Sequence, residues 1–180
     1  VGGLNVSIVN DQAPDGRLHT ASWGGANGDK SSYTFLTRAT PFNAPLDGTK
    51  FDLGVFTHNN FPIPQGSGIT QIDMVFNLGI DSLPSLGTTF IFNHEETPNK
   101  PPCAYPGSPP CPDRVTISNL SLHSDFIYQG NSYSFSLLGF SQDGGLTTSS
   151  QFITQERQAN NASLYVLITP FATPEPVTLF

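Results

Sequence analysis

The strongest constraint on the fold is a two-residue alternation of apolar and polar side chains between residues 69 and 80. Ile72, Met74 and Phe76 fall on one side of an extended chain, and Asp73 and Asn77 fall on the other. A period of two is typical of a strand with one buried face. Similar short segments recur along the chain, separated by turn-forming Gly, Pro, Asn and Asp. The expected strands are residues 4–9, 31–38, 50–57, 69–80, 88–94, 114–120, 133–140, 152–154 and 164–168.

These segments predict an all-β fold, an antiparallel β-sandwich or jelly roll of about eight or nine short strands with little or no helix. At most one turn of helix is expected, within residues 151–161. A chain of 180 residues suits one domain, which we place at residues 1–170. Its 14 Phe residues and 37% hydrophobic content can supply the core, and the single Trp23 is expected there, with exposed stacking on a sugar ring as the alternative.

The charge pattern argues against one class of partner. The chain carries 7 Lys and Arg against 14 Asp and Glu, a formal net charge of −7, and its basic residues are scattered. Neutralising phosphates requires clustered Lys and Arg, so a nucleic-acid partner is not expected. Charged residues make up only 12% of the chain, against about 25% in an average domain.

Both cysteines, Cys103 and Cys111, lie in a proline-rich segment spanning residues 100–113. Such a segment cannot be a helix or a central strand. A disulfide across the short loop is the favoured interpretation, and a metal-binding pair is the alternative, for which a second pair of ligands would be needed elsewhere. A disulfide would indicate an oxidising compartment.

Two polar clusters follow expected strands. His58 and Asn60 come after one strand, and His94, Glu96 and Asn99 come after another. If the two strands are neighbours with their ends at one rim, the histidines could meet there, with Glu96, Asn99 and Asp113 beside them. Oxygen ligands of this kind suit Ca²⁺ and imidazoles suit a transition metal, whereas a network that holds tight turns explains the clusters without any ligand. The candidate metal ligands are therefore His58, Asn60, His94, Glu96, Asn99 and Asp113.

No catalytic residue is assigned from the sequence. Glu95 and Glu96 would point to opposite faces of a strand, so they do not form an acid–base pair. Glu96 with Asp113 or with Glu156 remains open as the carboxylate pair of a glycosidase. The familiar metalloprotease, phosphate-binding, dinucleotide-binding and EF-hand spacings are absent.

The carboxyl end contains Pro174, Glu175 and Pro176, followed by Val177 to Phe180. This segment resembles the start of the PEP-CTERM sorting signal, in which a Pro-Glu-Pro motif precedes a hydrophobic span and a basic tail. The alternative is an ordinary proline-rich end. We therefore interpret residues 171–180 as the stub of a sorting or anchoring signal. Its membrane-spanning part is expected to be missing from the given sequence, since no run of 18 apolar residues occurs there.

The chain also contains an ordered set of segments at residues 51–63, 92–99, 113–117, 133–140, 152–156 and 164–168. This set is similar to the choice-of-anchor K domain. The resemblance implies an exported domain of a Gram-negative-type bacterium, and it implies no activity or catalytic residues. The cysteine-containing insertion departs from the family pattern.

Together these features predict an exported cell-surface or extracellular-matrix protein that is structural and not an enzyme. Its expected partners are exopolysaccharide or further copies of itself, paired through an edge strand that residues 4–9 or 164–171 would donate. It would contact the membrane only through the missing anchor. The alternatives are a calcium-dependent glycan-binding module, with Ca²⁺ as its cofactor, and a polysaccharide hydrolase.

Overall fold

The computed structural model of the chain describes residues 6–12, 15–25, 30–80 and 85–171, and these residues form strands and turns without any helix. Consequently this part of the chain contains no helix that could cross a membrane. The strands are β1 (Ser7–Gln12), β2 (Leu18–Gly24), β3 (Lys30–Thr37), β4 (Phe51–Asn60), β5 (Gln71–Leu78), β6 (Leu86–Glu95), β7 (Asp113–Ile117), β8 (His123–Tyr128), β9 (Asn131–Ser141), β10 (Gln151–Thr154) and β11 (Gln158–Phe171).

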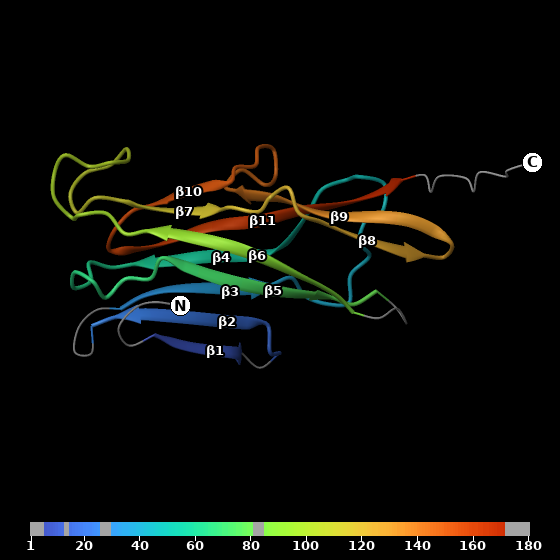
Figure 1. The fold of residues 1–180 in the computed structure, drawn as a ribbon, viewed down its shortest axis with the longest axis horizontal. Helices are drawn as coiled ribbons and strands as arrows, with labels where there is room; N and C mark the ends of the chain where they lie inside the picture. The colour runs from blue at the N-terminus through green and yellow to red at the C-terminus, as the bar shows by residue number, and fades with distance from the viewer. Residues whose placement is uncertain (1–5, 13–14, 26–29, 81–84, 172–180) are drawn as a thin grey trace, which may run out of the picture.

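The strands make two antiparallel sheets that face each other, which confirms the all-β, sandwich-like fold. The larger sheet has the order β1-β2-β3-β4-β11-β9-β8, and the smaller has the order β10-β7-β6-β5. In Figure 1 the smaller sheet lies over the larger one, with β1 and β2 projecting beyond β5. The apolar faces of both sheets therefore meet in one interior layer.

Aromatic side chains fill that layer. Phe56 of β4 stacks on Phe92 of β6 with ring centroids 5.4 Å apart, and Phe35 of β3 meets Phe76 of β5 edge to face at 5.2 Å. Trp23 is fully buried, as expected. The interior face of β5 also follows the expected alternation, since Ile72, Met74 and Phe76 all pack in or against the core.

The strand number was underestimated, because the described residues alone form eleven strands instead of eight or nine. β2 and β8 were missed. The buried positions of β2 include Ala21 and the glycine Gly24, and β8 is an edge strand in which no residue is fully buried. Neither segment therefore has the run of large alternating apolar residues that marks a strand in sequence. The helical turn allowed within residues 151–161 is also absent, because β10 and β11 are joined there by a tight turn with Arg157 at a φ of 61°.

A β-bulge in β4 changes which face of the strand is buried. The pairing with β11 shifts between Leu164 and Tyr165, which lie opposite Gly54 and Asp52. Gly54 has a φ of 152°, and a Cβ there would lie 2.2 Å from the carbonyl oxygen of Leu36. Phe51 is buried before the bulge, whereas Phe56 is buried after it. An unbroken alternation along residues 50–57 would bury Val55 together with Phe51, but Val55 is 37% exposed because the bulge reverses the alternation.

The last strand of the domain is central in its sheet. β11 pairs with β4 on one side and with β9 on the other. Residues 164–166 pair on both edges and residues 167–171 pair with β9 alone, so the segment proposed as a donor is part of the domain's own sheet. Phe171 belongs to this strand and pairs with Ser132, so the expected tail does not begin there. Pro174, Glu175 and Pro176 lie outside the described residues.

The other expected donor, residues 4–9, falls partly on β1, which pairs with β2 at the edge of the larger sheet. Residues 4 and 5 lie outside the described part of the chain. The expected disulfide is confirmed: the Cα atoms of Cys103 and Cys111 are 5.2 Å apart and their sulfurs are bonded. Cys111 is fully buried, so the disulfide holds the proline-rich loop against the body of the domain.

Candidate functional site

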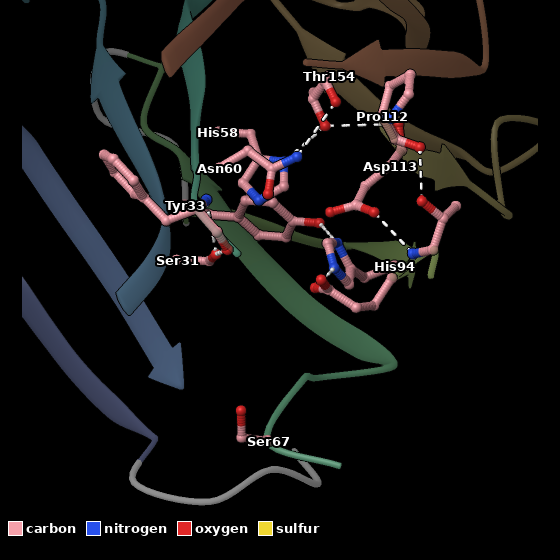
Figure 2. A network of polar contacts seen from close by, with 12 residues as sticks. Ser31, Tyr33, His58, Asn60, Ser67, His94, Pro112, Asp113 and Thr154 are labelled. Atoms are coloured by element: carbon pink, nitrogen blue, oxygen red, sulfur yellow. Dashed lines mark hydrogen bonds and ion pairs between the residues drawn. The ribbon is translucent and has the colours of Figure 1, made fainter. Parts of the chain in front are cut away.

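A cluster of buried polar side chains lies between the two sheets. Its members come from four strands: Tyr33 from β3, His58 from β4, His94 from β6 and Asp113 from β7. Figure 2 shows these side chains pointing toward one another. His58 and Asp113 have no exposed surface, and His94 is 6% exposed. The site is therefore part of the interior and not of the solvent-exposed rim.

The two histidines meet for a different reason from the one expected. His58 lies within β4, which continues to Asn60, and His94 lies within β6, so neither follows the end of a strand. β4 and β6 belong to opposite sheets. The rings meet edge to face across the interior, with centroids 5.2 Å apart. The bulge at Gly54 makes this possible, because it turns His58 and Asn60 inward.

His94 is held at both ring nitrogens. Its Nδ1 lies 2.5 Å from the hydroxyl of Tyr33, and its Nε2 lies 3.3 Å from Oε2 of Glu96. Burial lowers the pKa of His94 to about 4, so the ring is neutral near pH 7. The contact with Glu96 is therefore a hydrogen bond of a neutral ring and not an ion pair at that pH.

His58 is held at only one ring nitrogen. Its Nδ1 lies 2.8 Å from Oγ1 of Thr154, which in turn lies 3.5 Å from the carbonyl oxygen of Asp113. A Thr154 hydroxyl that donates to that carbonyl can accept a proton from Nδ1, and the lone pair of the neutral ring is then on Nε2. This Nε2 is buried and has no hydrogen-bond partner among the described residues. Burial, followed by the nearby His94, lowers the pKa of His58 well below its ordinary value.

Carboxyl groups surround the same space. Oδ1 of Asp113 accepts a hydrogen bond of 2.7 Å from the backbone N–H of Thr97, whereas its Oδ2 is buried and unpartnered within the described residues. Asp113, Glu96 and Glu156 each place one carboxylate oxygen within 4.8 Å of the other two. Asp113, His58 and His94 form a second group on the same criterion. Asp113 is thus shared by an oxygen-only group and a nitrogen-rich group.

Burial makes it unfavourable for these carboxyl groups to ionise. It raises the pKa of Glu96 to about 7, and burial together with the charge of Glu96 raises that of Asp113 to about 7. Burial likewise raises the pKa of Glu156, although the nearby Asn99 partly offsets the effect. Neither carboxylate oxygen of Glu156 has a hydrogen-bond partner among the described residues, so the approach of Asn99 falls short of hydrogen-bonding geometry.

The six expected ligands fall into two sets. His58, His94, Glu96 and Asp113 lie together as described. Asn60 lies beside them: its Nδ2 donates to the carbonyl oxygen of Thr154 at 3.2 Å, and its Oδ1 has no partner among the described residues. Asn99 lies near the carboxyl group of Glu156.

Three contributors were not assigned to this cluster from the sequence. Glu156 was considered only as a partner of Glu96 in a hydrolase, and Tyr33 and Thr154 were not considered. Glu156 lies in the turn between β10 and β11, and Thr154 ends a four-residue strand. Tyr33 belongs to a strand whose apolar pattern explains it as a core residue. No local sequence signal distinguishes these residues from ordinary turn or core positions.

Glu95 is not part of the cluster. Its carboxylate pairs with Arg114 at 2.6 Å on the outer surface, whereas Glu96 contacts His94. The two adjacent glutamates therefore have different partners, and Glu96 lies just beyond the end of β6.

A groove of about 710 Å³ leads to the cluster from the surface. It lies between residues 63–70 and residues 94–100, and His94, Glu96 and Asn99 are among its lining residues. The side chain of Glu96 is 24% exposed, so this residue connects the groove to the buried cluster. A small ion or a proton can therefore approach the cluster past Glu96.

The sequence matches no protein-family model. A search among curated proteins likewise gives no match.

Proposed function

We propose that the protein is an exported bacterial cell-surface or extracellular-matrix protein that acts as a structural, non-enzymatic β-sandwich module. The observation that carries the proposal is the Cys103–Cys111 disulfide, which closes a loop packed against the core. Disulfides persist in oxidising compartments and are rare in the bacterial cytosol. The low charge content and the resemblance to choice-of-anchor K domains with a PEP-CTERM-type tail support the same interpretation.

The direct test is localisation in the source organism. An antibody against the domain should label intact cells or the surrounding matrix, and the extracted protein should carry the disulfide. Mass spectrometry of the extracted protein should also show whether processing takes place beyond Pro174, Glu175 and Pro176. Recovery only from the cytosolic fraction, with both thiols reduced, would overturn the proposal.

The proposal includes self-association through the edge strand β8, in which β8 of one copy pairs with β8 of a second copy. Phe126, Ile127 and Tyr128 are consecutive in β8, and Ile127 is 64% exposed. Only β9 pairs with β8 among the described strands. Asp125 is the only acid in β8 and the strand has no Lys or Arg, so little charge opposes antiparallel pairing of two copies.

Sedimentation or light scattering over a range of concentrations tests the self-association. Ile127→Lys should shift the protein to the monomer, because it places a charge on the paired edge. Leu146→Lys is the matched control, since Leu146 is 81% exposed in the turn after β9 and lies outside β8. A wild-type protein that stays monomeric at millimolar concentration would exclude pairing through β8.

A glycan-binding module is the second candidate, favoured by the groove beside Glu96. Gln65, Glu96, Asn99 and Lys100 line the groove and can form hydrogen bonds to sugar hydroxyls. The carboxylates of Glu96, Asp113 and Glu156 offer the oxygen ligands that Ca²⁺ takes. A thermal shift with Ca²⁺ that EDTA removes, together with calcium-dependent retention on exopolysaccharide, would support this candidate; unchanged melting would exclude its calcium dependence.

A hydrolase has less support from the same residues. Asp113 has no exposed surface, and its carboxylate oxygen lies within 4.8 Å of that of Glu96, whereas glycosidases hold two accessible carboxyl groups about 5–10 Å apart. Polysaccharide cleavage that is lost in Glu96→Gln would contradict the non-enzymatic proposal.

A further inference from the structure

The buried cluster contains several polar atoms that have no hydrogen-bond partner among the described residues. Nε2 of His58, Oδ2 of Asp113 and both carboxylate oxygens of Glu156 are buried without a hydrogen bond to any described residue. His58 and Asp113 have no exposed surface, and Glu156 is 9% exposed. An unpartnered polar atom in the interior is energetically unfavourable. Several such atoms on neighbouring residues indicate a group that satisfies them together.

In each of the two histidines, Nδ1 is hydrogen-bonded to a hydroxyl group. Nδ1 of His58 bonds to Thr154 at 2.8 Å, and Nδ1 of His94 bonds to Tyr33 at 2.5 Å. This arrangement leaves Nε2 of His58 without a partner among the described residues, and it leaves Nε2 of His94 in contact with Glu96. Metal-binding histidines are usually oriented in this way, with the second ring nitrogen bonded to a neighbouring oxygen.

We propose that the cluster binds one divalent transition-metal ion, such as Zn²⁺ or Mn²⁺, through Nε2 of His58, Nε2 of His94 and the carboxylate of Asp113. Glu96 and Glu156 each place a carboxylate oxygen within 4.8 Å of a carboxylate oxygen of Asp113, and they supply further oxygen ligands. Glu96, which now contacts His94 Nε2 at 3.3 Å, turns its carboxylate to the ion when the ion is bound. The site goes beyond the structural role proposed above and does not depend on where the protein resides.

The chemistry of the donors favours this class of ion over Ca²⁺. Ca²⁺ takes six to eight oxygen ligands, whereas imidazole is a common ligand of zinc and of other transition metals. The two imidazoles are neutral near pH 7, as ligation requires. A dication also offsets the charge of the three neighbouring carboxylates, which burial otherwise disfavours.

The distances require only a small closure of the cluster. One donor atom from each of His58, His94 and Asp113 lies within 4.8 Å of the other two. Atoms bound to one ion at about 2.1 Å lie no more than about 4.2 Å apart. The ion can enter through the groove, which His94 and Glu96 line.

Metal-free protein, prepared by dialysis against EDTA, should be titrated separately with Zn²⁺, Mn²⁺ and Ca²⁺ in a calorimeter. We expect one transition-metal ion per chain with a dissociation constant in the micromolar range or below, and no competition from millimolar Ca²⁺. Co²⁺ should bind at the same site and give visible absorption bands that Zn²⁺ removes. Binding of Ca²⁺ in preference to both transition metals would overturn the proposal, as would no binding at all.

Three variants locate the ion. Asp113→Asn removes a central ligand with little change of shape, and it should abolish stoichiometric binding. Glu156→Gln serves as a second variant in case Asp113→Asn does not fold, because Glu156 lies in the turn after β10. It should weaken binding at least about tenfold. His123→Ala, which alters an exposed histidine of β8, is the matched control and should bind as the wild type does. Far-UV circular dichroism checks folding of each variant. Unchanged affinity in folded Asp113→Asn or Glu156→Gln, or lost affinity in His123→Ala, would place the ion elsewhere.

Discussion

The imidazole of His58, in the larger sheet, packs edge to face against the imidazole of His94, in the smaller sheet, with ring centroids 5.2 Å apart. Trp23 covers both rings, with centroids 5.8 Å from His58 and 5.4 Å from His94. The polar cluster is therefore also an aromatic contact between the two layers. Its members should contribute to stability as well as to binding.

The hydroxyl of Tyr33 should stabilise the metal-free domain. Tyr33→Phe leaves Nδ1 of His94 buried without its partner, so we expect the free energy of unfolding to fall by roughly 1–3 kcal/mol. Urea denaturation of EDTA-treated protein measures the change. Tyr128→Phe is the control, because its hydroxyl accepts an exposed hydrogen bond from Gln129 and its loss should cost less. Equal stability of Tyr33→Phe and wild type would show that the contact with His94 contributes nothing.

Loss of the disulfide should destabilise the domain. The bond joins residues separated by 8 positions, and closing a loop of this length contributes about 2–3 kcal/mol in the chain-entropy description. We therefore expect the Cys103→Ala/Cys111→Ala double variant to unfold at a lower denaturant concentration than the oxidised wild type.

The reduced wild-type protein is the natural comparison for that double variant. It should unfold close to where the double variant does, since both lack the covalent link. If the oxidised protein and the double variant unfold together, the loop is held by its packing alone.

Gly54 should not tolerate a side chain. Gly54→Ala would bring a Cβ to 2.2 Å from the carbonyl oxygen of Leu36 and 2.9 Å from Cα of Thr37, at a φ of 152°. We expect a loss of at least about 2 kcal/mol in unfolding free energy, or failure to fold. Gly87→Ala is the matched control in strand β6, because the nearest atom to its Cβ would be 3.5 Å away. Thermal melting of both variants tests the bulge, and similar melting temperatures would contradict its assigned role.

Asp143 should stabilise the turn after β9 in a pH-dependent manner. Hydrogen bonds from the side chain and backbone of Thr147, and from the hydroxyl of Ser141, lower the pKa of Asp143 to about 2 from an ordinary value of 3.8. A carboxyl group with a lowered pKa in the folded state stabilises that state above its unfolded pKa. The contribution is lost as the pH falls through the folded value.

Asp143→Asn should therefore melt below the wild type at pH 5, and the difference should shrink as the pH falls from about 4 to about 2. Melting temperatures at several pH values measure this effect. Asp125→Asn, which also removes one exposed acid, is the control for net charge. A difference between Asp143→Asn and wild type that stays constant down to pH 2 would rule out the carboxylate as its source.

Local patterns in the sequence were sufficient to predict the fold class and the disulfide. The alternation in β5 depends only on neighbouring residues, and the two cysteines lie close along the chain. The strand pattern failed at Gly54, because a bulge reverses the alternation without changing the composition of the segment. It also failed at β8, whose edge position leaves its residues half exposed.

The site could be predicted only in part, for a physical reason. Histidines with neighbouring carboxyl and amide groups are visible in the sequence, so His58, His94, Glu96 and Asp113 could be grouped correctly. Their contact depends on two sheets facing each other, which no local pattern encodes. Glu156 joins them from a turn that follows the shortest strand of the domain. Its role depends on the long-range pairing of β10 with β7.

The central position of β11 has a consequence for how the chain acquires its structure. The final fourteen-residue strand joins β4 to β9, so the seven-stranded sheet has no continuous middle until residues 158–171 have been synthesised. A nascent chain that ends before residue 158 lacks β11, the strand that connects β1–β4 to β9 and β8 in this sheet. The larger sheet can therefore be completed only after residues 158–171 have been synthesised, and its folding rate should be limited by bringing distant segments together. Removing residues from the carboxyl end of the domain would therefore delete part of an interior strand before it affected either edge strand of the sheet.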